Sequence, residues 1–422
     1  MKEFKLLSEY KRQIINFLYL SCIQTVNLIS PLVILPFLII KFGIEGYGSI
    51  AFAQAISFYV STLINFGFNV SGTKKISEFR NEKKIKDKTI SSIYIIKLII
   101  YLFLVAVVYG FFLFSGKWLS NDSFCYLVLL YSISTLYDVF FPVWYFLGIE
   151  KMKIITITNT ISKLLFCISI FIFIGNQTNI LLVPILFIIC NLLAIIFPLF
   201  ILFKSECYKP TLPNKMFLIS TIKEAYIFFI ADFMAILKDR TNILIIGSCL
   251  SMSSVAYFDV IQKIIGFIRS IFINFNNAFF PLIVRTRRPK DVKIGIWGSL
   301  GFSILTYLII VTFSDILISF LSKGRIENDI IVFSIAALFI ITASISSTIG
   351  LFILIPNGYQ NKFLYNLFLA TLVYLLLIMI LFLTNNINLI SLLIAYNMSV
   401  FIELCHRCYL CYKFKLTPYL LK

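Results

Sequence analysis

Long apolar runs separated by short polar breaks recur along the whole chain. The runs are about 20 to 30 residues long, enough to cross a hydrocarbon core about 30 Å thick as helices. A membrane barrel would instead show alternating segments of about ten residues. We therefore predict an all-α polytopic membrane protein. Its twelve transmembrane helices are expected at residues 13–40, 49–69, 91–115, 123–147, 154–174, 180–203, 222–250, 255–284, 294–322, 330–355, 363–383 and 389–412.

Composition supports this class of protein. Of the 422 residues, 60% are hydrophobic and only 13% are charged, whereas soluble domains are about 25% charged. The charged start MKEFKLLSEYKR leads into a long apolar run without a small-residue cleavage site. This pattern favours a retained first helix over a signal peptide.

Basic residues predict the orientation in the membrane. Of the 37 Lys and Arg residues, 26 fall in one set of alternate loops and termini and four in the other. Cytoplasmic loops carry the excess, so both termini are expected in the cytoplasm. The net charge of +18 then reflects this bias and attraction to anionic membrane lipids, and we predict no nucleic-acid partner.

The longest polar interruption, KSECYKPTLPNK at 204–215, divides the spans into six and six. We expect an N-terminal six-helix bundle (1–205), a cytoplasmic linker (206–221) and a C-terminal six-helix bundle (222–422) around a central cavity. Six is even, so both halves enter from the cytoplasm, as in transporters built from parallel repeats. Loops too short for a soluble domain and the lack of a GxxxxGK[ST] motif argue against ATP-driven transport and soluble enzyme chemistry.

Charged residues inside the seventh and eighth spans require an explanation, because charge at the bilayer centre is costly. The seventh contains AILKDRTNILIIG at 235–247. In the eighth, polar positions share one arc of the helix and isoleucines fill the opposite side. A structural pair between Asp259 and Lys263 at i, i+4 is the alternative to a wet face, and it would leave Arg269 without a partner in its own helix.

We predict that basic side chains on these two spans form a cationic wall that suits an anionic phosphate group. The residues are Lys238, Arg240, Lys263 and Arg269. Three nearby acids either tune this wall or carry a coupling H⁺ or Na⁺. They are Asp232, Asp239 and Asp259.

Polar stripes in other spans suggest a cavity lining that contacts sugars, because amides, carboxylates and aromatic rings suit hydroxyl-rich ligands. The candidate residues are Gln54, Asn65, Tyr131, Asp138, Tyr145, Lys163, Gln262 and Asn277. Interfacial anchoring and helix packing are the alternative roles. The cysteine-rich CHRCYLC at 405–411 is interpreted as helix-end packing, and we predict neither a metal site, nor another cofactor, nor a catalytic set.

Three short segments resemble the polysaccharide transporter family, and within it the bacterial O-antigen repeat-unit flippases (Wzx). They are KFGIEGYG (41–48), NFGFNVSGTKKISEFR (65–80) and PVWYFLGIEKMK (142–153). The resemblance implies a MATE-like fold that alternates between membrane faces. It also implies a flippase in the bacterial inner membrane. The implied substrate is an undecaprenyl-diphosphate-linked oligosaccharide, with other polysaccharide assembly proteins as further partners.

Two other classes of protein fit the sequence less well. A multidrug or cation antiporter of the same fold would favour acidic and aromatic cavities, whereas the deep charges here include four basic residues. A membrane polymerase or glycosyltransferase would need a large extracytoplasmic loop or an acidic metal motif, and the sequence has neither.

Overall fold

The computed structural model describes residues 2–114, 123–175, 179–286, 288–416 and 419. The side chains at 2–18, 20, 277–278, 281–282, 286 and 364 fall outside that description. Every regular element in the described residues is a helix. The prediction of an all-α chain is confirmed.

Among the described residues, nine helical segments are long and apolar enough to cross a membrane. The first, Ser21–Glu78, has 58 residues and covers the first two predicted spans. Two further helices, α9 (Lys215–Cys249) and α10 (Met252–Thr286), have 35 residues each. At 1.5 Å per residue, each is about 50 Å long and sufficient to span a bilayer. The described helices therefore accommodate the twelve predicted spans.

The chain divides into two compact units. Unit 1 comprises Met1–Phe42 and Ser49–Ile236, and unit 2 comprises Gly43–Gly48 and Leu237–Lys422. This division counts the first part of α9 with unit 1. The expected bundle boundaries at 205 and 222 stay a prediction.

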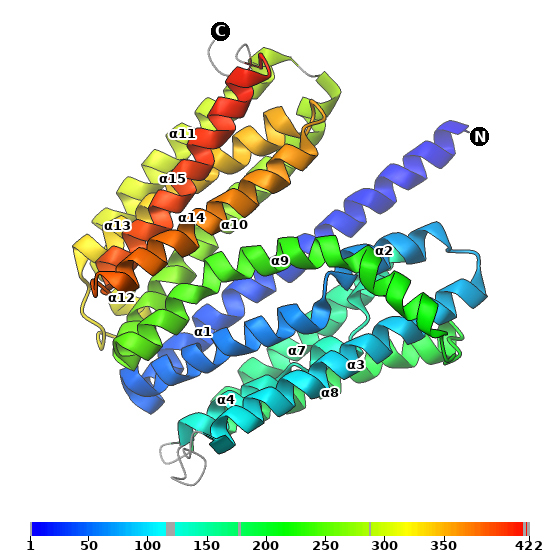
Figure 1. Ribbon diagram of the computed structural model, residues 1–422, viewed down its shortest axis with the longest axis horizontal. Helices are drawn as coiled ribbons and strands as arrows, with labels where there is room; N and C mark the ends of the chain where they lie inside the picture. Colours follow the sequence, from blue (N-terminus) through cyan, green and yellow to red (C-terminus); the bar gives the residue numbers. More distant parts are fainter. Residues whose placement is uncertain (1, 115–122, 176–178, 287, 417–418, 420–422) are drawn as a thin grey trace. The chain divides into compact units, whose positions relative to one another are not determined.

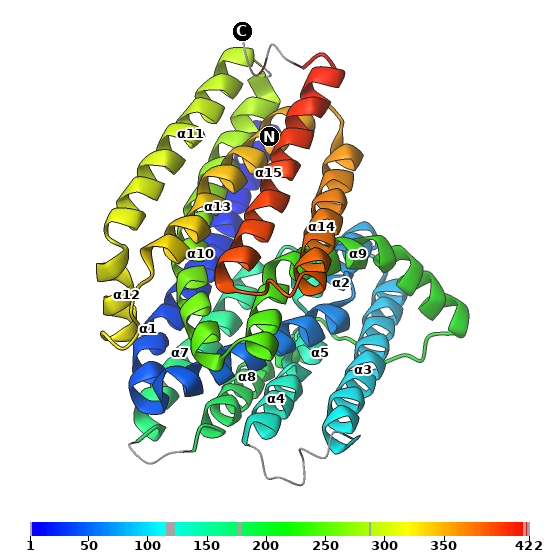
Figure 2. The same ribbon diagram turned by 60° about the vertical axis from the view of Figure 1, so that its left-hand side comes forward.

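Unit 1 is a helical bundle in which α3, α4, α7 and α8 lie side by side (Figures 1 and 2). Besides the first part of α9, its helices are α1 (Lys2–Asn65, apart from the segment assigned to unit 2), α2 (Phe68–Glu78), α3 (Lys83–Phe114), α4 (Ser123–Ser134), α5 (Leu136–Phe140), α6 (Val143–Gly148), α7 (Met152–Phe173), α8 (Leu182–Phe200) and the π-helix η1 (Ile201–Ser205).

Two features of the backbone divide the predicted spans. The label α1 covers two helices that meet at a kink at Gly43, whose φ of 74° an L side chain rarely adopts, so the first two predicted spans are separate helices. The fourth span is not continuous but is divided into α4, α5 and α6. Pro142, which lacks an N–H donor, sits at the second division, just before α6.

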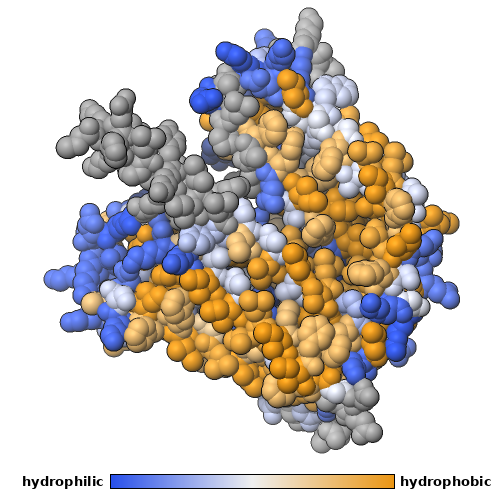
Figure 3. Space-filling view, turned by 180° about the vertical axis from the view of Figure 1, so that it is seen from behind, coloured by the Kyte–Doolittle hydropathy of each residue, from blue (hydrophilic) through white to orange (hydrophobic). Residues whose placement is uncertain are grey.

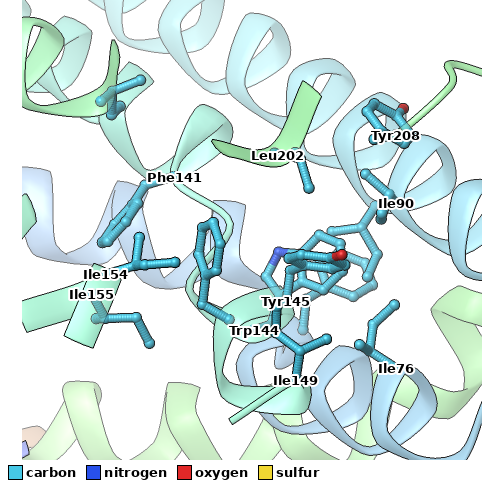
Figure 4. Close-up of a cluster of buried hydrophobic side chains, with 14 of the residues drawn as sticks. Ile76, Ile90, Phe141, Trp144, Tyr145, Ile149, Ile154, Ile155, Leu202 and Tyr208 are labelled. Carbon is cyan, nitrogen blue, oxygen red and sulfur yellow. The ribbon is translucent and has the colours of Figure 1, made fainter. Parts of the chain in front are cut away.

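Two of the three segments that carried the family resemblance, 65–80 and 142–153, pack against each other in unit 1. Helices α2 and α6 are in contact, and the Thr73 hydroxyl donates to the Trp144 carbonyl oxygen at 3.1 Å. A Cβ on Gly148 would lie 2.8 Å from Ile76, so the glycine permits the close approach. Figure 4 shows Trp144 and Tyr145 inside the buried apolar cluster formed around this contact. These motif residues therefore build the core of unit 1.

Unit 2 is a second bundle, in which α13 contacts α11 and α15, and α14 contacts α15 (Figures 1 and 2). Besides the later part of α9 and α10, its helices are α11 (Pro289–Thr312), α12 (Ser314–Ser322), α13 (Ile330–Ile349), the π-helix η2 (Gly350–Leu354), α14 (Gln360–Leu383) and α15 (Leu389–Lys413).

Large apolar side chains face outward along many helices. Phe103 and Phe111 on α3 are each 67% exposed, and Figure 3 shows apolar residues covering much of one face of the molecule. Soluble proteins rarely expose such continuous apolar surface. The outward faces therefore suit contact with lipid chains.

Candidate functional site

A buried cluster in unit 2 joins two cations to one carboxylate. The Lys238 Nζ on α9 lies 2.8 Å from Glu403 Oε2 on α15, and Arg407 Nη2 lies 2.7 Å from Glu403 Oε1. Ser346 on α13 donates its hydroxyl to the same carboxylate at 3.2 Å. All three charged side chains are less than one-tenth exposed. We call Lys238, Glu403 and Arg407 the buried triad, which carries one excess positive charge.

The polar face of α10 forms a second cluster. Lys263 pairs with Asp259 one turn earlier, and both contact the hydroxyl of Tyr47, which lies in the short part of α1 that belongs to unit 2. Lys263 Nζ also lies 5.0 Å from the centre of the Tyr47 ring. The structure thus contains the i, i+4 pair that the sequence offered as an alternative. It adds an aromatic partner from the KFGIEGYG segment.

Arg269 has its partner on another helix. Its guanidinium lies 3.5 Å from the Asp239 carboxylate on α9, and the Tyr396 hydroxyl donates to Asp239 at 3.2 Å. The Arg269 side chain is 48% exposed and that of Asp239 is 43% exposed. The guanidinium also lies 5.5 Å from the Phe339 ring centre. This pair is therefore accessible, unlike the buried triad.

Three residues of the predicted cationic wall thus pair with three different carboxylates. Lys238 pairs with Glu403, Lys263 with Asp259 and Arg269 with Asp239. The other residues predicted for this region are placed as follows: Arg240 and Gln262 are half-buried, Asp232 is exposed in the part of α9 that belongs to unit 1, and the side chain of Asn277 lies outside the described part of the structure.

In unit 1, Lys97 on α3 is buried, with 1% of its surface exposed. Its Nζ donates to Asn65 Oδ1 and to the backbone carbonyl of Asp138, both at 2.9 Å. Charged groups inside a bundle need such partners. Lys97 therefore fixes the end of α1 to α5.

Asn65 and Asp138 line a cavity of about 310 Å³ in unit 1. We call it the amide cavity, because four of its lining residues are asparagines. Its full lining is Ile23, Asn27, Asn65, Asn69, Tyr137, Asp138, Phe141, Val143, Leu147, Ile155 and Asn159. The helices α1, α2, α5, α6 and α7 contribute these residues, and Phe141 lies between α5 and α6.

The other sugar candidates of unit 1 lie outside this lining. Gln54 Nε2 donates to the Tyr131 hydroxyl at 3.1 Å. The Lys163 Nζ lies 5.3 Å from the Phe187 ring centre. Neither contact places these side chains in the amide cavity.

Tyr145 is buried and donates its hydroxyl to Glu206 Oε2 at 3.0 Å. Glu206 follows η1 in the linker and also pairs with Lys151. Burial raises the pKa of Glu206, but the hydrogen bonds from Lys151 and Tyr145 lower it more, so the pKa of this carboxyl lies below its usual value. Tyr145 therefore anchors α6 to the start of the linker.

Sequence reasoning missed four polar residues that the structure makes prominent. They are Glu403 in the buried triad and Asn27, Asn69 and Asn159 in the amide cavity. Glu403 could have been noticed as an acid inside an apolar span, paired at i, i+4 with Arg407. The asparagines come from three different helices, and no spacing along the chain connects them.

The fold of two helical units with outward apolar faces defines a class of multi-pass membrane protein. The structure is similar to that of a multidrug resistance MATE family transporter of the MOP superfamily in its inward-facing conformation, with a TM-score of 0.75, 12% identity and coverage of 95% of this chain and 99% of that chain. It is also similar to the lipid II flippase MurJ, with a TM-score of 0.75, 15% identity and coverage of 96% of this chain and 89% of that one. The MATE-like fold is therefore confirmed.

The chain belongs to the family described as "Polysaccharide biosynthesis protein", which it matches over residues 14–287. It is 25% identical to the "Putative O-antigen transporter" of Escherichia coli (strain K12) over 371 residues, which are 86% of this chain and 88% of the relative. A protein of the same name from Shigella dysenteriae is 25% identical over 271 residues, 63% of this chain and 66% of that relative. The predictions of the family and of a transporter rather than an enzyme are confirmed.

Proposed function

We propose that this protein is a flippase for undecaprenyl-diphosphate-linked O-antigen or related polysaccharide repeat units. It moves them from the cytoplasmic to the periplasmic leaflet by alternating access. The observation that carries this proposal is the similarity over 86% of the chain to a protein named as an O-antigen transporter. The MATE-like fold supports the same proposal, because it is a fold of membrane transporters.

The charge inside unit 2 supports an anionic substrate. The inner parts of α9, α10 and α15 carry two more basic than acidic residues. They are Lys238, Arg240, Lys263, Arg269 and Arg407 against Asp239, Asp259 and Glu403. A diphosphate leaving water needs such compensation, whereas a cationic drug would be repelled. This excess favours the flippase over the multidrug or cation antiporter.

Arg269 is the best-placed residue for the diphosphate. Its guanidinium is half exposed and pairs with Asp239 at 3.5 Å, a long contact that a phosphate oxygen could replace. Guanidinium groups bind phosphate through two parallel hydrogen bonds. In this proposal the positive charges of Lys238, Arg240 and Lys263 make the electrostatic potential around Arg269 more positive.

The proposed function also includes a coupling ion, a membrane location and partners. Asp232, Asp239 and Asp259 are the candidates for coupling transport to H⁺ or Na⁺. The protein resides in the bacterial inner membrane with both termini in the cytoplasm, as the distribution of Lys and Arg predicts. Lipid-linked oligosaccharide, membrane lipids and other polysaccharide assembly proteins are its partners.

The test uses the organism's own deletion strain and measures surface polysaccharide at matched membrane abundance of each variant. Arg269→Ala is expected to lower surface polymer about tenfold, because one charged hydrogen bond contributes about 1.5–3 kcal/mol and 1.4 kcal/mol is a factor of ten. Lys362→Ala, an exposed position of the same unit, is the matched control and should leave the polymer unchanged. If the wild-type gene does not restore polymer to the deletion strain, the flippase proposal fails.

A double variant separates a binding role from a structural one. If Arg269 only neutralises Asp239, then Arg269→Ala combined with Asp239→Asn should restore polymer. If Arg269 binds the diphosphate, the double variant stays defective in a background where Asp239→Asn alone keeps normal polymer, which is the expected result. Normal polymer from Arg269→Ala alone would exclude the diphosphate role.

A further inference from the structure

The lining of the amide cavity in unit 1 combines two kinds of group. Four lining residues carry amides, Asn27, Asn65, Asn69 and Asn159, and most of the others are apolar or aromatic, including Tyr137 and Phe141. The two ring centres are 5.1 Å apart. A sugar ring has the same division, with hydroxyls around its edge and C–H groups on its faces.

Three of the four amides are available to a ligand. Asn65 is the exception, because its oxygen accepts from Lys97 and its nitrogen donates to the Ser61 hydroxyl at 3.4 Å. Asn159 donates to the Ile155 carbonyl at 3.0 Å, which leaves its oxygen as an acceptor. The side chains of Asn27 and Asn69 line the cavity without a hydrogen bond to any other described residue. The cavity therefore offers both donors and acceptors.

Tyr137, one of the lining residues, adds an unused polar group. Its hydroxyl is buried and has no hydrogen-bond partner among the described residues. Buried hydroxyls in proteins are generally paired. A ligand hydroxyl that reached Tyr137 would satisfy this group.

Size and charge define the ligand further. A volume of about 310 Å³ is at the lower end of ligand pockets, which span roughly 300–1,000 Å³, so it suits a single ring rather than a whole oligosaccharide. Among the lining residues described, Asp138 is the acid and none is basic. The carboxylate of an acidic sugar would lose its hydration in this cavity and find no cation among these lining residues. It would also be repelled by the Asp138 carboxylate.

We infer that the amide cavity binds one neutral sugar residue of the lipid-linked substrate through its hydroxyl or acetamido groups and discriminates against acidic sugars. This inference rests on the proposed flippase function and identifies the part of the substrate that unit 1 recognises. Asn27, Asn69 and Asn159 contact the sugar, the rings of Tyr137 and Phe141 pack on its face, and Lys97 is a positioning residue that orients Asn65.

The test measures equilibrium binding to the purified full-length protein in lipid nanodiscs. Three probes are used: undecaprenyl diphosphate alone, the same lipid carrying glucose, and the same lipid carrying glucuronic acid. The two sugars differ only at C6, where a hydroxymethyl group replaces a carboxylate. The wild-type protein is expected to bind the glucose-bearing lipid about tenfold more tightly than either of the others.

The variant carries Asn69→Leu and Asn159→Leu, which keep the branched shape of the side chain but remove the amides. It is expected to bind all three lipids with the affinity that the wild type has for bare undecaprenyl diphosphate, and this retained binding shows that the variant is folded. Asn361→Leu, at an exposed position of unit 2, is the control and should keep the tenfold preference.

The outcomes separate this inference from the proposed function. A wild-type protein that binds none of the three lipids would overturn the flippase proposal itself. Equal wild-type affinity for the three lipids, or an unchanged glucose preference in the double variant, would overturn the sugar site and leave the flippase proposal standing. Glucuronic acid bound as tightly as glucose would overturn the discrimination against acidic sugars.

Discussion

Replacement of Glu403 by glutamine is expected to destabilise unit 2 strongly. The carboxylate is the one anion of the buried triad and accepts from Lys238 at 2.8 Å, Arg407 at 2.7 Å and Ser346 at 3.2 Å. Glutamine has nearly the same shape but no charge, so two buried cations would lose their counter-ion. Removing one partner of a buried ion pair costs about 3–5 kcal/mol, because a desolvated charge is left uncompensated.

The matched comparison is Lys238→Met, which keeps the apolar stem of the lysine. This change leaves Glu403 and Arg407 as a neutral pair, so no buried charge is left uncompensated. We therefore expect a smaller loss, of about 1.5–3 kcal/mol for the lost hydrogen bond between charged groups. The variant that combines Lys238→Met with Glu403→Gln should be more stable than Glu403→Gln alone, because one buried cation rather than two then lacks a counter-ion.

Thermal unfolding in detergent, followed by the fraction of monodisperse protein on size exclusion, measures these differences. A loss of about 3 kcal/mol corresponds to a decrease in Tm of roughly 6–12 °C for a unit of this size. The physical argument would be refuted by a Tm for Glu403→Gln equal to that of the wild type. A larger decrease for Lys238→Met than for Glu403→Gln would refute it as well.

Two further predictions concern unit 1. Gly67→Ala should lower its stability by about 3 kcal/mol, because φ is 70° and the new Cβ would lie 2.5 Å from the backbone nitrogen of Phe229. The control is Gly110→Ala, whose new Cβ meets nothing within 4 Å and which should stabilise α3 by up to about 1 kcal/mol. Equal changes in Tm for the two variants would contradict this reasoning. The folded-state pKa of Glu206 is lowered, so its pair with Lys151 stabilises above the ordinary carboxyl pKa of 4.5 and loses this effect as the pH falls below that value. The difference in Tm between wild type and Glu206→Gln should therefore shrink from pH 7 to pH 4, and a constant difference would count against the pair.

Helix number and the local pairing on α10 could be predicted because they depend on short-range patterns. Apolar runs define spans, and a spacing of four residues places Asp259 beside Lys263 on one helix face. Pairs between helices are different. Lys238 and Glu403 are 165 residues apart, and Asp239 pairs with Arg269 rather than with its chain neighbours. Packing of the bundle decides such contacts.

Breaks within spans also limited the prediction of the site. Tyr131, Asp138 and Tyr145 are spaced by seven and would share a face of one continuous helix. The divisions at Thr135 and Pro142 end that regular rotation. Asp138 therefore lines the amide cavity, while Tyr145 packs in the core and reaches Glu206.

The excess positive charge of the buried triad has a consequence for energetics across a living membrane. One elementary charge that moves through the full transmembrane potential changes in energy by about 2.3 kcal/mol per 100 mV. If α9 and α15 carried the triad through even a quarter of that field during the transport cycle, the two end states would differ by about 0.6 kcal/mol at 100 mV. The rate of flipping would then respond to membrane voltage, even for an electrically balanced exchange of substrate and ion.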